Sequence, residues 1–520
     1  MKIIKRILIG IAIFLVIGFG YLYNNISDRH PDYTIDLVIN TTDAPREIKV
    51  GFAKISISPE IIDTWNDVDG NAKYDPGKGD SYNDLNGNGE FDAVWIAGFH
   101  NRRPAQGIHD DIWARVMIVD DGRTRIAIVG LDVVGFLHDE VVDIRKALPE
   151  ELKIDYTIVC STHNHEGPDL VGIWGESPFK SGVDAEYMQY VKDNTVIAIQ
   201  RSVENLRPAK LRFAQDLENG ANFVMDTRLP EEMDPGIRII QAIDLEADTT
   251  LGLLISWGNH PETLWSDNLL ISSDFPHYIR ESVETGVKKG KRVLAEGLGG
   301  IAVYISSSVG GLMTTRPSFS IPDPFTGENL SGATFKKTEA QGQQIGLLVL
   351  NALKSDKVVE IEKANINLIA KTISIPLDNN NFKLGFALGV INHGTMGWMN
   401  VRTEVSVFEI GPASFITVPG EIYPEIVNGG VVSPPGQDFV ISPLEVPPLR
   451  SFMQGKFKFV FGLANDEIGY IIPKSEWDEK PPYLYNDNDS PYGEENSLGP
   501  ETGPIVYNRI VELLRSLNNE

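Results

Sequence analysis

A short apolar run that ends in two histidines constrains this chain more than any other feature. The run from Tyr156 to Val159 is rich in β-branched residues and predicts a buried strand. His163 and His165 follow at its exit, just before a Gly-Pro turn. In an extended segment the two rings share one face, about 7 Å apart at Cα. One ring could then hold a metal while the other acts beside it, and two polar loop histidines are the alternative.

Three further apolar runs deliver polar residues in the same way. Ligand clefts of sheet-based folds lie at strand ends, so these side chains are candidates for one shared site. Two neutral imidazoles and a carboxylate form a normal zinc set that leaves room for water. The expected strands and the residues that follow them are Thr250–Trp257 with His260, Ser414–Val418 with Glu421, and Lys456–Phe461 with Tyr470.

Strands and helices alternate along most of the chain, which predicts an α/β fold of mixed β-sheets with flanking helices. The β-branched runs 108–119 and 125–134 are joined by Asp121-Gly122 and predict a hairpin. The proline-rich segment 434–448 predicts an ordered surface loop. Other expected strands are Ile237–Leu245, Ile301–Ser306 and Ile361–Pro376, and the expected helices are Val141–Leu152, Asp184–Leu206, Pro276–Lys288, Gln341–Lys354 and Ile505–Leu517.

Charge and cysteine content limit the partners and the chemistry. The net charge is −26, so a phosphate backbone would be repelled and no nucleic-acid partner is expected. Cys160 is the only cysteine, which rules out an intrachain disulfide and a thiolate zinc cluster. A thiol beside histidines can be activated, but the apolar alternation around Cys160 favours a buried packing residue.

The N-terminus predicts a membrane segment. Basic residues at positions 2, 5 and 6 precede an almost unbroken apolar run from Ile7 to Tyr23. This order predicts a cytoplasmic N-terminus and a catalytic domain on the extracytoplasmic side, periplasmic or extracellular. The run is slightly shorter than the roughly 20 residues that span a bilayer, yet no Ala-x-Ala-like cleavage site follows it. We favour an uncleaved signal anchor over residues 1–24, with a removed signal peptide as the alternative, and expect a polar tether over residues 25–48.

Between residues 63 and 92 the composition becomes acidic and glycine-rich. Oxygen ligands at alternate positions, with glycine allowing sharp turns, suit a hard cation such as Ca²⁺. The flanks are not helical and the twelfth-position Glu is absent, so neither loop is a full EF-hand, and a solvated acidic loop is the alternative. The candidate calcium ligands are Asp67, Asp69, Asn71 and Asp75 in one loop and Asp84, Asn86, Asn88 and Asp92 in the other.

An ordered set of motifs resembles the neutral ceramidase family. The opening segment Val50–Pro59 and the closing segment Ser497–Gly503 look like the edges of that family's catalytic domain. The resemblance covers nearly all of the chain after the apolar run. Between these edges the matching motifs, in chain order, are Gly107-Ile-His109-Asp-Asp-Ile-Trp-Ala-Arg115, Ser161-Thr-His-Asn-His-Glu-Gly-Pro168, Asn259-His-Pro261, Ser273-Asp-Phe-Pro276, Val418-Pro-Gly-Glu421 and Gly462-Leu-Ala-Asn465.

The resemblance implies a role for each candidate site residue. It implies that His165 hydrogen-bonds at the scissile amide and that His109 lines the pocket. Thr314 is the candidate catalytic hydroxyl, and Arg228 and Tyr483 are candidates for substrate contact. The implied zinc ligands are His163, His260, Glu421 and Tyr470.

Two departures from the family pattern bear on the mechanism. The family serine falls on Met313, and the family arginine falls on Met225, with Arg228 nearby as a substitute. We therefore expect a zinc-dependent hydrolase that cleaves an amide bond in an N-acyl, ceramide-like lipid or another small amide by means of zinc-activated water. A non-catalytic or ester-specific envelope protein that retains the fold is the alternative.

The resemblance also predicts the domain organisation. It implies one neutral-ceramidase-like catalytic domain over residues 49–520, with the acidic segment 63–92 as an insertion within it. Longer ceramidases carry a C-terminal immunoglobulin-like domain. No residues follow Glu520 to form one, so we expect the catalytic domain alone.

Overall fold

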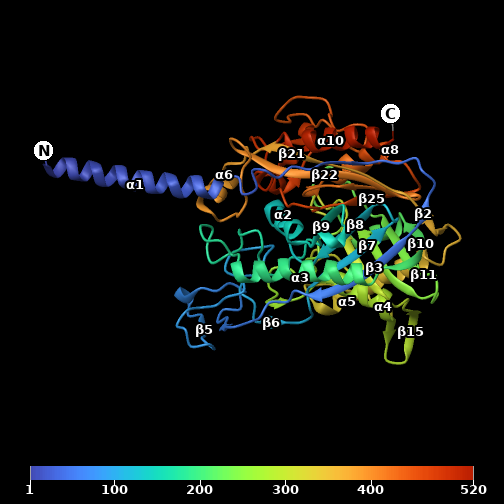
Figure 1. Ribbon diagram of the computed structural model, residues 1–520. Coiled ribbons are helices and arrows are strands. Elements are labelled where there is room, and N and C mark those ends of the chain that lie inside the picture. The colour runs from blue at the N-terminus through green and yellow to red at the C-terminus, as the bar shows by residue number, and fades with distance from the viewer. Residues whose placement is uncertain (1, 519–520) are drawn as a thin grey trace.

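The computed structural model describes residues 2–518, and a nine-stranded sheet lies at its centre (Figure 1). Eight strands lie in the order β16-β12-β11-β10-β3-β7-β8-β9, and β19 pairs with β10. The β12–β16 and β8–β9 pairs are parallel, and the other pairs are antiparallel. The strand bounds are β3 Lys49–Ser56, β7 Trp113–Asp120, β8 Arg125–Leu131, β9 Tyr156–Ser161, β10 Arg207–Asp216, β11 Ile237–Asp244, β12 Thr250–Trp257, β16 Ile301–Ser306 and β19 Val359–Ile361.

A second, five-stranded sheet has the order β1-β21-β22-β23-β25. Its pairs are antiparallel except for β23–β25, which is parallel. The strands are β1 Asp36–Ile39, β21 Ile366–Pro376, β22 Asn400–Ile410, β23 Ala413–Thr417 and β25 Phe457–Phe461.

The two sheets face each other across a shared hydrophobic core. Phe213 and Leu254 enter this core from the nine-stranded sheet, and Phe408, Phe415 and Phe459 enter it from the other. The ring of Phe415 stacks on those of Phe408 and Phe459, with centroid distances of 4.3 and 4.7 Å. Stacked, fully buried aromatic rings contribute both area and specific geometry, so this cluster holds the sheets together.

Helices cover the outer face of each sheet, which gives four layers (Figure 1). Asp184 caps the N-terminus of α3 by accepting from the backbone N–H groups of Glu186 and Tyr187. Helices α2 (His138–Ala147), α3 (Ala185–Glu204), α4 (Phe275–Thr285) and α5 (Phe335–Ala352) cover the nine-stranded sheet, whereas α7 (Pro424–Asn428), α8 (Leu449–Phe452) and α10 (Thr502–Leu517) cover the five-stranded one.

Short elements connect these layers. The parallel pair β24 (Glu421–Ile422) and β26 (Tyr470–Ile471) brings two predicted site residues side by side. Two short helices are α6 Asn380–Leu388 and α9 Tyr492–Glu495. The other two-stranded pairs are β2 Arg46–Glu47 with β20 Lys363–Ala364, β4 Thr64–Asn66 with β5 Ser81–Asn83, β6 Gly107–Ile108 with β13 Leu270–Ile271, β14 Gly286–Lys289 with β15 Arg292–Glu296, and β17 Ile321–Pro322 with β18 Asn329–Leu330. The 3-10 turns are Pro76–Lys78, Glu150–Leu152, Asn219–Phe223, Lys474–Glu476 and Leu484–Asn486.

The N-terminal helix α1 (Lys2–Ile26) projects away from the four layers (Figure 1). Its segment Ile3–Ile26 is long and apolar enough to cross a membrane by length and composition, and none of it is buried in the protein. A signal sequence has the same properties, so this helix is weak support for a membrane anchor.

Several sequence predictions coincide with observed elements. The strands predicted at Thr250–Trp257 and Ile301–Ser306 are β12 and β16, and the helix predicted at Asp184–Leu206 is α3. The predicted hairpin is β7 and β8, but its first strand begins at Trp113. Residues before Trp113 lie outside this strand, because Gly107–Ile108 pairs separately with β13.

The expected polar tether over residues 25–48 is wrong. Asp36–Ile39 forms β1, the edge strand of the five-stranded sheet, and pairs with Leu368–Lys371 of β21. Leu37 and Ile39 pack against the core between the sheets. Their two-residue alternation is a strand signal that the surrounding polar residues hide. The folded body therefore includes part of the segment between the anchor and residue 49.

The core between the sheets predicts a large stability cost for Phe415→Ala. Removing this ring should lower the free energy of unfolding by about 3–5 kcal/mol, because the cavity left between two stacked rings cannot collapse. The exposed Phe179 is the matched control, and Phe179→Ala should change stability by less than about 0.5 kcal/mol. Chemical denaturation of both variants measures the difference, and equal costs would contradict this account of the core.

Candidate functional site

Strands from both sheets end at one place. Within the nine-stranded sheet, β9 and β12 deliver the segments that carry His163 and His260. The turn after β25 pairs with the end of β9, since Ser161 N donates to Leu463 O at 3.1 Å. The same turn contacts the end of β16, because Gly462 N donates to Ser306 O at 3.0 Å. Residues far apart in sequence thus meet at the adjoining edges of the two sheets.

His163 is held in an unusual backbone conformation. Its φ is +66°, a left-handed conformation that costs a non-glycine residue roughly 1–2 kcal/mol. The conformation turns the chain sharply after β9, and the ring Nδ1 lies 2.7 Å from the carbonyl oxygen of Val134. Backbone strain concentrates at functional sites, so this residue is a candidate on conformational grounds alone.

His163, His260 and Glu421 form an arrangement that requires a compensating positive charge. Oε2 of Glu421 lies 3.3 Å from Nε2 of His163 and 3.0 Å from Nε2 of His260. Nδ1 of each ring faces a backbone carbonyl oxygen, that of Val134 for His163 and that of Met313, at 2.7 Å, for His260. A carbonyl oxygen only accepts hydrogen bonds, so both Nδ1 atoms must carry a proton. In neutral rings both Nε2 lone pairs then point at a carboxylate. A shared cation or ring protonation relieves this repulsion, and metal-binding histidines are oriented by such second hydrogen bonds.

The electrostatics of Glu421 are consistent with this need. Burial alone would raise the pKa of the carboxyl, but the positive charges of His163 and His260 outweigh burial and hold it below its usual range. Desolvation would lower the pKa of His260, but the hydrogen bond to Glu421 and the negative charges of Glu262 and Glu421 together raise it. Nε2 of His163 is buried and forms no hydrogen bond of good geometry. These donors fit a metal such as zinc, which binds imidazole and carboxylate.

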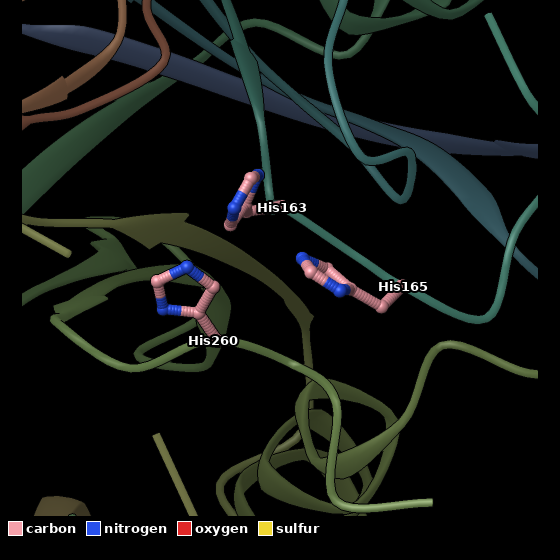
Figure 2. Close-up of side chains that lie close together, drawn as sticks. All are labelled: His163, His165 and His260. Carbon is pink, nitrogen blue, oxygen red and sulfur yellow. The ribbon is translucent and has the colours of Figure 1, made fainter. Parts of the chain in front are cut away.

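His165 completes a cluster of three buried histidines that converge on one point (Figure 2). One ring nitrogen from each of His163, His165 and His260 lies within 4.8 Å of the others. Tyr470 lies beside Glu421 in the β24–β26 pair. Burial and the negative charge of Glu421 raise the pKa of the Tyr470 hydroxyl well above its usual range.

A second carboxylate, Glu262, lies on the other side of His165. Its Oε2 is 3.2 Å from Nδ1 of His165, and its Oε1 accepts a short hydrogen bond from the Thr314 hydroxyl. Burial, with the charges of His163 and His260, depresses the pKa of His165 well below its usual range, so this ring is neutral near pH 7. A neutral imidazole held between a carboxylate and the cluster is suited to accept a proton.

Arg103 fixes the backbone around His165. Its guanidinium is fully buried and donates to the carbonyl oxygens of Ala97 and His165 through short hydrogen bonds, and to that of Trp265 at 3.2 Å. Glu166 lies 3.7 Å away and is the nearest counter-charge. A planar guanidinium that joins three carbonyls holds the strand exit in one conformation.

Two members of the histidine cluster line a mostly apolar cavity. His163 and His165 do so together with Glu421 and Tyr470. The apolar lining includes Val134, Leu137, Val171, Ile173, Trp174, Phe382, Phe386, Ile391, Val401, Ile468 and Leu498. An apolar cavity with a few convergent polar groups is the usual form of a small-molecule site.

Comparisons with known proteins identify the architecture. Neutral ceramidase from Pseudomonas aeruginosa superimposes with a TM-score of 0.61 over 92% of this chain and 75% of that one, at 15% sequence identity. The chain has a neutral-ceramidase fold. A structure described as ceramidase complexed with C2 gives a TM-score of 0.60 at 14% identity, over 91% of this chain and 76% of that one. No protein-family model matches the sequence. The resemblance drawn from the ordered motifs thus agrees with a neutral-ceramidase fold over 92% of the chain.

Some predicted residues lie elsewhere in the neutral-ceramidase fold. His109 does not line the cavity, which corrects its expected role: its ring stacks on Phe335 at 3.6 Å between centroids and faces Asp110. Its position follows from the β6–β13 pairing, which holds residues 107 and 108 outside the hairpin. Tyr483 is also absent from the lining of the cavity, and instead precedes the 3-10 turn Leu484–Asn486.

Arg228 lies in a neighbouring pocket rather than in the histidine cavity. It is paired with Glu494 at 2.9 Å and lies over the ring of Tyr423 at 4.7 Å. Tyr492 lines both this pocket and the histidine cavity. Met313, expected at the position of the family serine, is buried in the core beneath α4 and α5, and only its carbonyl oxygen reaches the site.

Sequence reasoning missed Glu262, His393 and Tyr492. Glu262 is two residues after His260 on the same turn, and a search of that turn for carboxylates would have found it. His393 lines the cavity, and its ion pairs with Asp466 and Asp139 raise its pKa to about 9 despite burial. No local pattern marks His393 or Tyr492, because each reaches the cavity only through tertiary packing.

The acidic segment 63–92 forms a β4–β5 hairpin with two tight turns. Asp67 accepts from the backbone of Gly70, Asn71 and Ala72, and Asp84 accepts from that of Gly87, Asn88 and Gly89. The carboxylates that approach one another are those of Asp67, Asp69 and Asp80, so Asp80 lies beside the first predicted loop. The calcium assignment stays a prediction.

Metal binding at the histidine cluster should be measurable as thermal stabilisation. Zn²⁺ added to chelator-treated protein should raise Tm, since a ligand that binds only the native state adds about 2.7 kcal/mol at a concentration 100-fold above Kd. The double variant His163→Ala, His260→Ala removes both nitrogens that face Glu421 and should abolish the shift. His109→Ala removes a histidine outside the cavity and should retain it. An undiminished shift in the double variant would contradict the metal assignment.

Proposed function

We propose that this protein is a zinc-dependent hydrolase of the amide bond in an N-acyl, ceramide-like substrate. One observation carries the metal part of the proposal: two imidazoles, each with Nδ1 donating to a carbonyl, turn Nε2 toward the buried carboxylate of Glu421. The ceramidase comparisons and the apolar cavity support the substrate class.

The proposed zinc ligands are His163, His260, Glu421 and Tyr470. When bound, zinc would supply Lewis-acid chemistry that polarises the scissile carbonyl and activates water. Around it, the chain's own residues orient the substrate. The apolar walls of the cavity exclude water from the acyl chain, and the polar end receives the amide.

His165 is the proposed proton carrier. Its neutral ring can take a proton from the attacking water and pass it to the leaving amine. Glu262 approaches Nδ1 of this ring to 3.2 Å, and Thr314 holds Glu262 by donating its hydroxyl. Thr314 therefore acts as a positioning residue in this proposal, since its proton is already committed to a carboxylate.

The proposed location follows from α1 and the basic residues at its start. Positions 2, 5 and 6 carry Lys, Lys and Arg ahead of the apolar segment, a pattern that keeps the N-terminus in the cytoplasm. The catalytic body would then lie on the extracytoplasmic side of the membrane, anchored by α1. The substrate would be an N-acyl lipid of that membrane or another small amide.

The proposed roles predict a graded loss of activity on a soluble short-chain N-acyl substrate. Thr314→Val should lower kcat/KM by about 10- to 100-fold, the loss of one orienting hydrogen bond, whereas Thr314→Ser should retain most activity. His165→Ala should cost roughly 10²–10⁴-fold, as expected for proton transfer, and His163→Ala or Glu421→Ala should cost more. If Thr314→Ser were as inactive as Glu421→Ala while retaining its metal, the positioning role of Thr314 would be wrong.

Steady-state kinetics on matched amide and ester substrates would measure both the grading and the bond preference. A protein that binds metal at the cluster but cleaves neither bond would contradict the hydrolase proposal. Cleavage of the ester with no detectable cleavage of the amide at equal acyl length would contradict the amide assignment alone.

The acidic segment predicts calcium-dependent stability. If Ca²⁺ binds the loops around Asp67 and Asp84, its removal with EGTA should lower Tm, because the bound ion stabilises only the folded state. The double variant Asp67→Asn, Asp84→Asn should show the lower Tm with and without calcium. Identical melting of the wild type before and after verified calcium removal would leave these loops as solvated acidic turns.

A further inference from the structure

Helix α6 forms one wall of the apolar cavity. Phe382 and Phe386 are spaced i, i+4, so they lie on the same helix face, and both line the cavity. Leu384 lies between them in sequence and points to the opposite face, where it is 51% exposed. One short helix thus presents apolar side chains both to the cavity and to the surroundings.

The end of α1 docks on this same helix. The Tyr21 hydroxyl donates to the carbonyl of Leu388, and Nδ2 of Asn25 donates to that of Ala387, each at 2.9 Å. These carbonyls belong to the last turn of α6, which has no partners for them within the helix. Thr395 donates through its backbone N–H and its hydroxyl to the carbonyl of Ile26, at 3.0 and 2.7 Å. The membrane helix candidate is therefore attached to the cavity wall itself.

This attachment sets the level of α6 relative to a bilayer. The apolar segment Ile3–Ile26 is about 36 Å long at 1.5 Å per residue, enough to cross the hydrocarbon core of roughly 30 Å. Its C-terminal end, with Tyr21 and Tyr23, would then lie at the membrane surface. Aromatic residues are favoured at the membrane surface. Trp398, on the turn before β22, is 80% exposed and lies on the same side of the protein as Thr395.

The rim of the cavity is also apolar and partly exposed. Phe382 and Trp174 are half-buried, and Tyr492 is exposed. The segment that carries Trp174 lies against the turn that follows α6, since a Cβ added at Gly172 would collide with the carbonyl oxygen of Val390. The net charge of −26 opposes electrostatic attraction to anionic lipids, so contact with a membrane here would depend on apolar and aromatic insertion.

We propose that α6 and the turn carrying Trp398 form a second membrane contact, which seats in the phospholipid interface beside α1 and opens the cavity toward the bilayer. An N-acyl lipid would enter the cavity along α6 directly from the membrane. The contact is with the bilayer surface, and the role in substrate entry rests on the proposed hydrolase function.

The membrane contact can be tested without any turnover. The full chain, reconstituted in phosphatidylcholine vesicles, is labelled with an environment-sensitive fluorophore in the variants Leu384→Cys and Trp398→Cys. Val293→Cys is the matched control: Val293 is 47% exposed, on the β14–β15 hairpin, which lies far from α1 (Figure 1). The native Cys160 is buried, and burial raises its thiol pKa, so it should not react.

Emission from positions 384 and 398 should shift to shorter wavelength on reconstitution, and quenching by aqueous iodide should fall. Position 293 should show neither change. All three variants carry α1, so a difference between them reports the local surface and not the anchor. Probes at 384 and 398 that are quenched as strongly as the probe at 293 would overturn the proposal, whatever the enzymatic activity.

Substrate entry is tested with the double variant Leu384→Ser, Trp398→Ser. It should hydrolyse an N-acyl lipid embedded in vesicles about tenfold more slowly than wild type, because two interfacial apolar side chains are lost, and a soluble short-chain N-acyl substrate at the wild-type rate. Val293→Ser should affect neither. Equal loss on both substrates, or no loss on either, would overturn the entry route. A wild type that cleaves neither substrate would instead contradict the proposed function, and the probe measurement would still decide the membrane contact.

Discussion

The site depends on how the free edge of β9 is satisfied. β9 is the last strand of its sheet, and backbone groups on its free edge pair with the turn that follows β25 of the other sheet. Asn465 makes this pairing specific: its N–H donates to Val159 O at 2.6 Å, and its side-chain oxygen accepts from Val159 N at 2.8 Å. Because unpaired buried backbone groups are costly, this pairing fixes the register between the sheets. The exits of β9 and β25 are thereby brought together, with the histidine cluster between them.

Charge burial is the second constraint on the site. Glu421, Glu262 and Glu166 are all buried there, and each faces a basic group or a histidine ring. A buried carboxylate without such a partner would cost several kcal/mol or take up a proton. The arrangement is therefore stable only when cationic groups or a metal balance the acids. The strained backbone of His163 is maintained by the same surroundings, because its ring is fixed between Val134 and Glu421.

Much of the secondary structure could be predicted from local patterns. The sequence predicts β12 and β16 at their observed bounds because each is rich in apolar residues, and it predicts α3 because its apolar residues recur at helical spacing. β1 was missed because its short alternation lies among polar residues, and it becomes a strand only through pairing with β21. β22 was not anticipated either, although it is the central strand of its sheet. Strand formation depends on partners that a local pattern does not contain.

The sequence by itself determined which residue types follow the ends of the apolar strands, and it predicts His163, His165, His260 and Glu421 at these positions. Only the tertiary structure decided which of them face one another, that Glu262 joins them, and that His109 does not line the cavity. The physical reason is that strand exits follow from local periodicity, whereas the distance between two exits follows from sheet order and from the packing of one sheet on the other. The same packing placed α6 between the cavity and the end of α1, a position that no local pattern indicates.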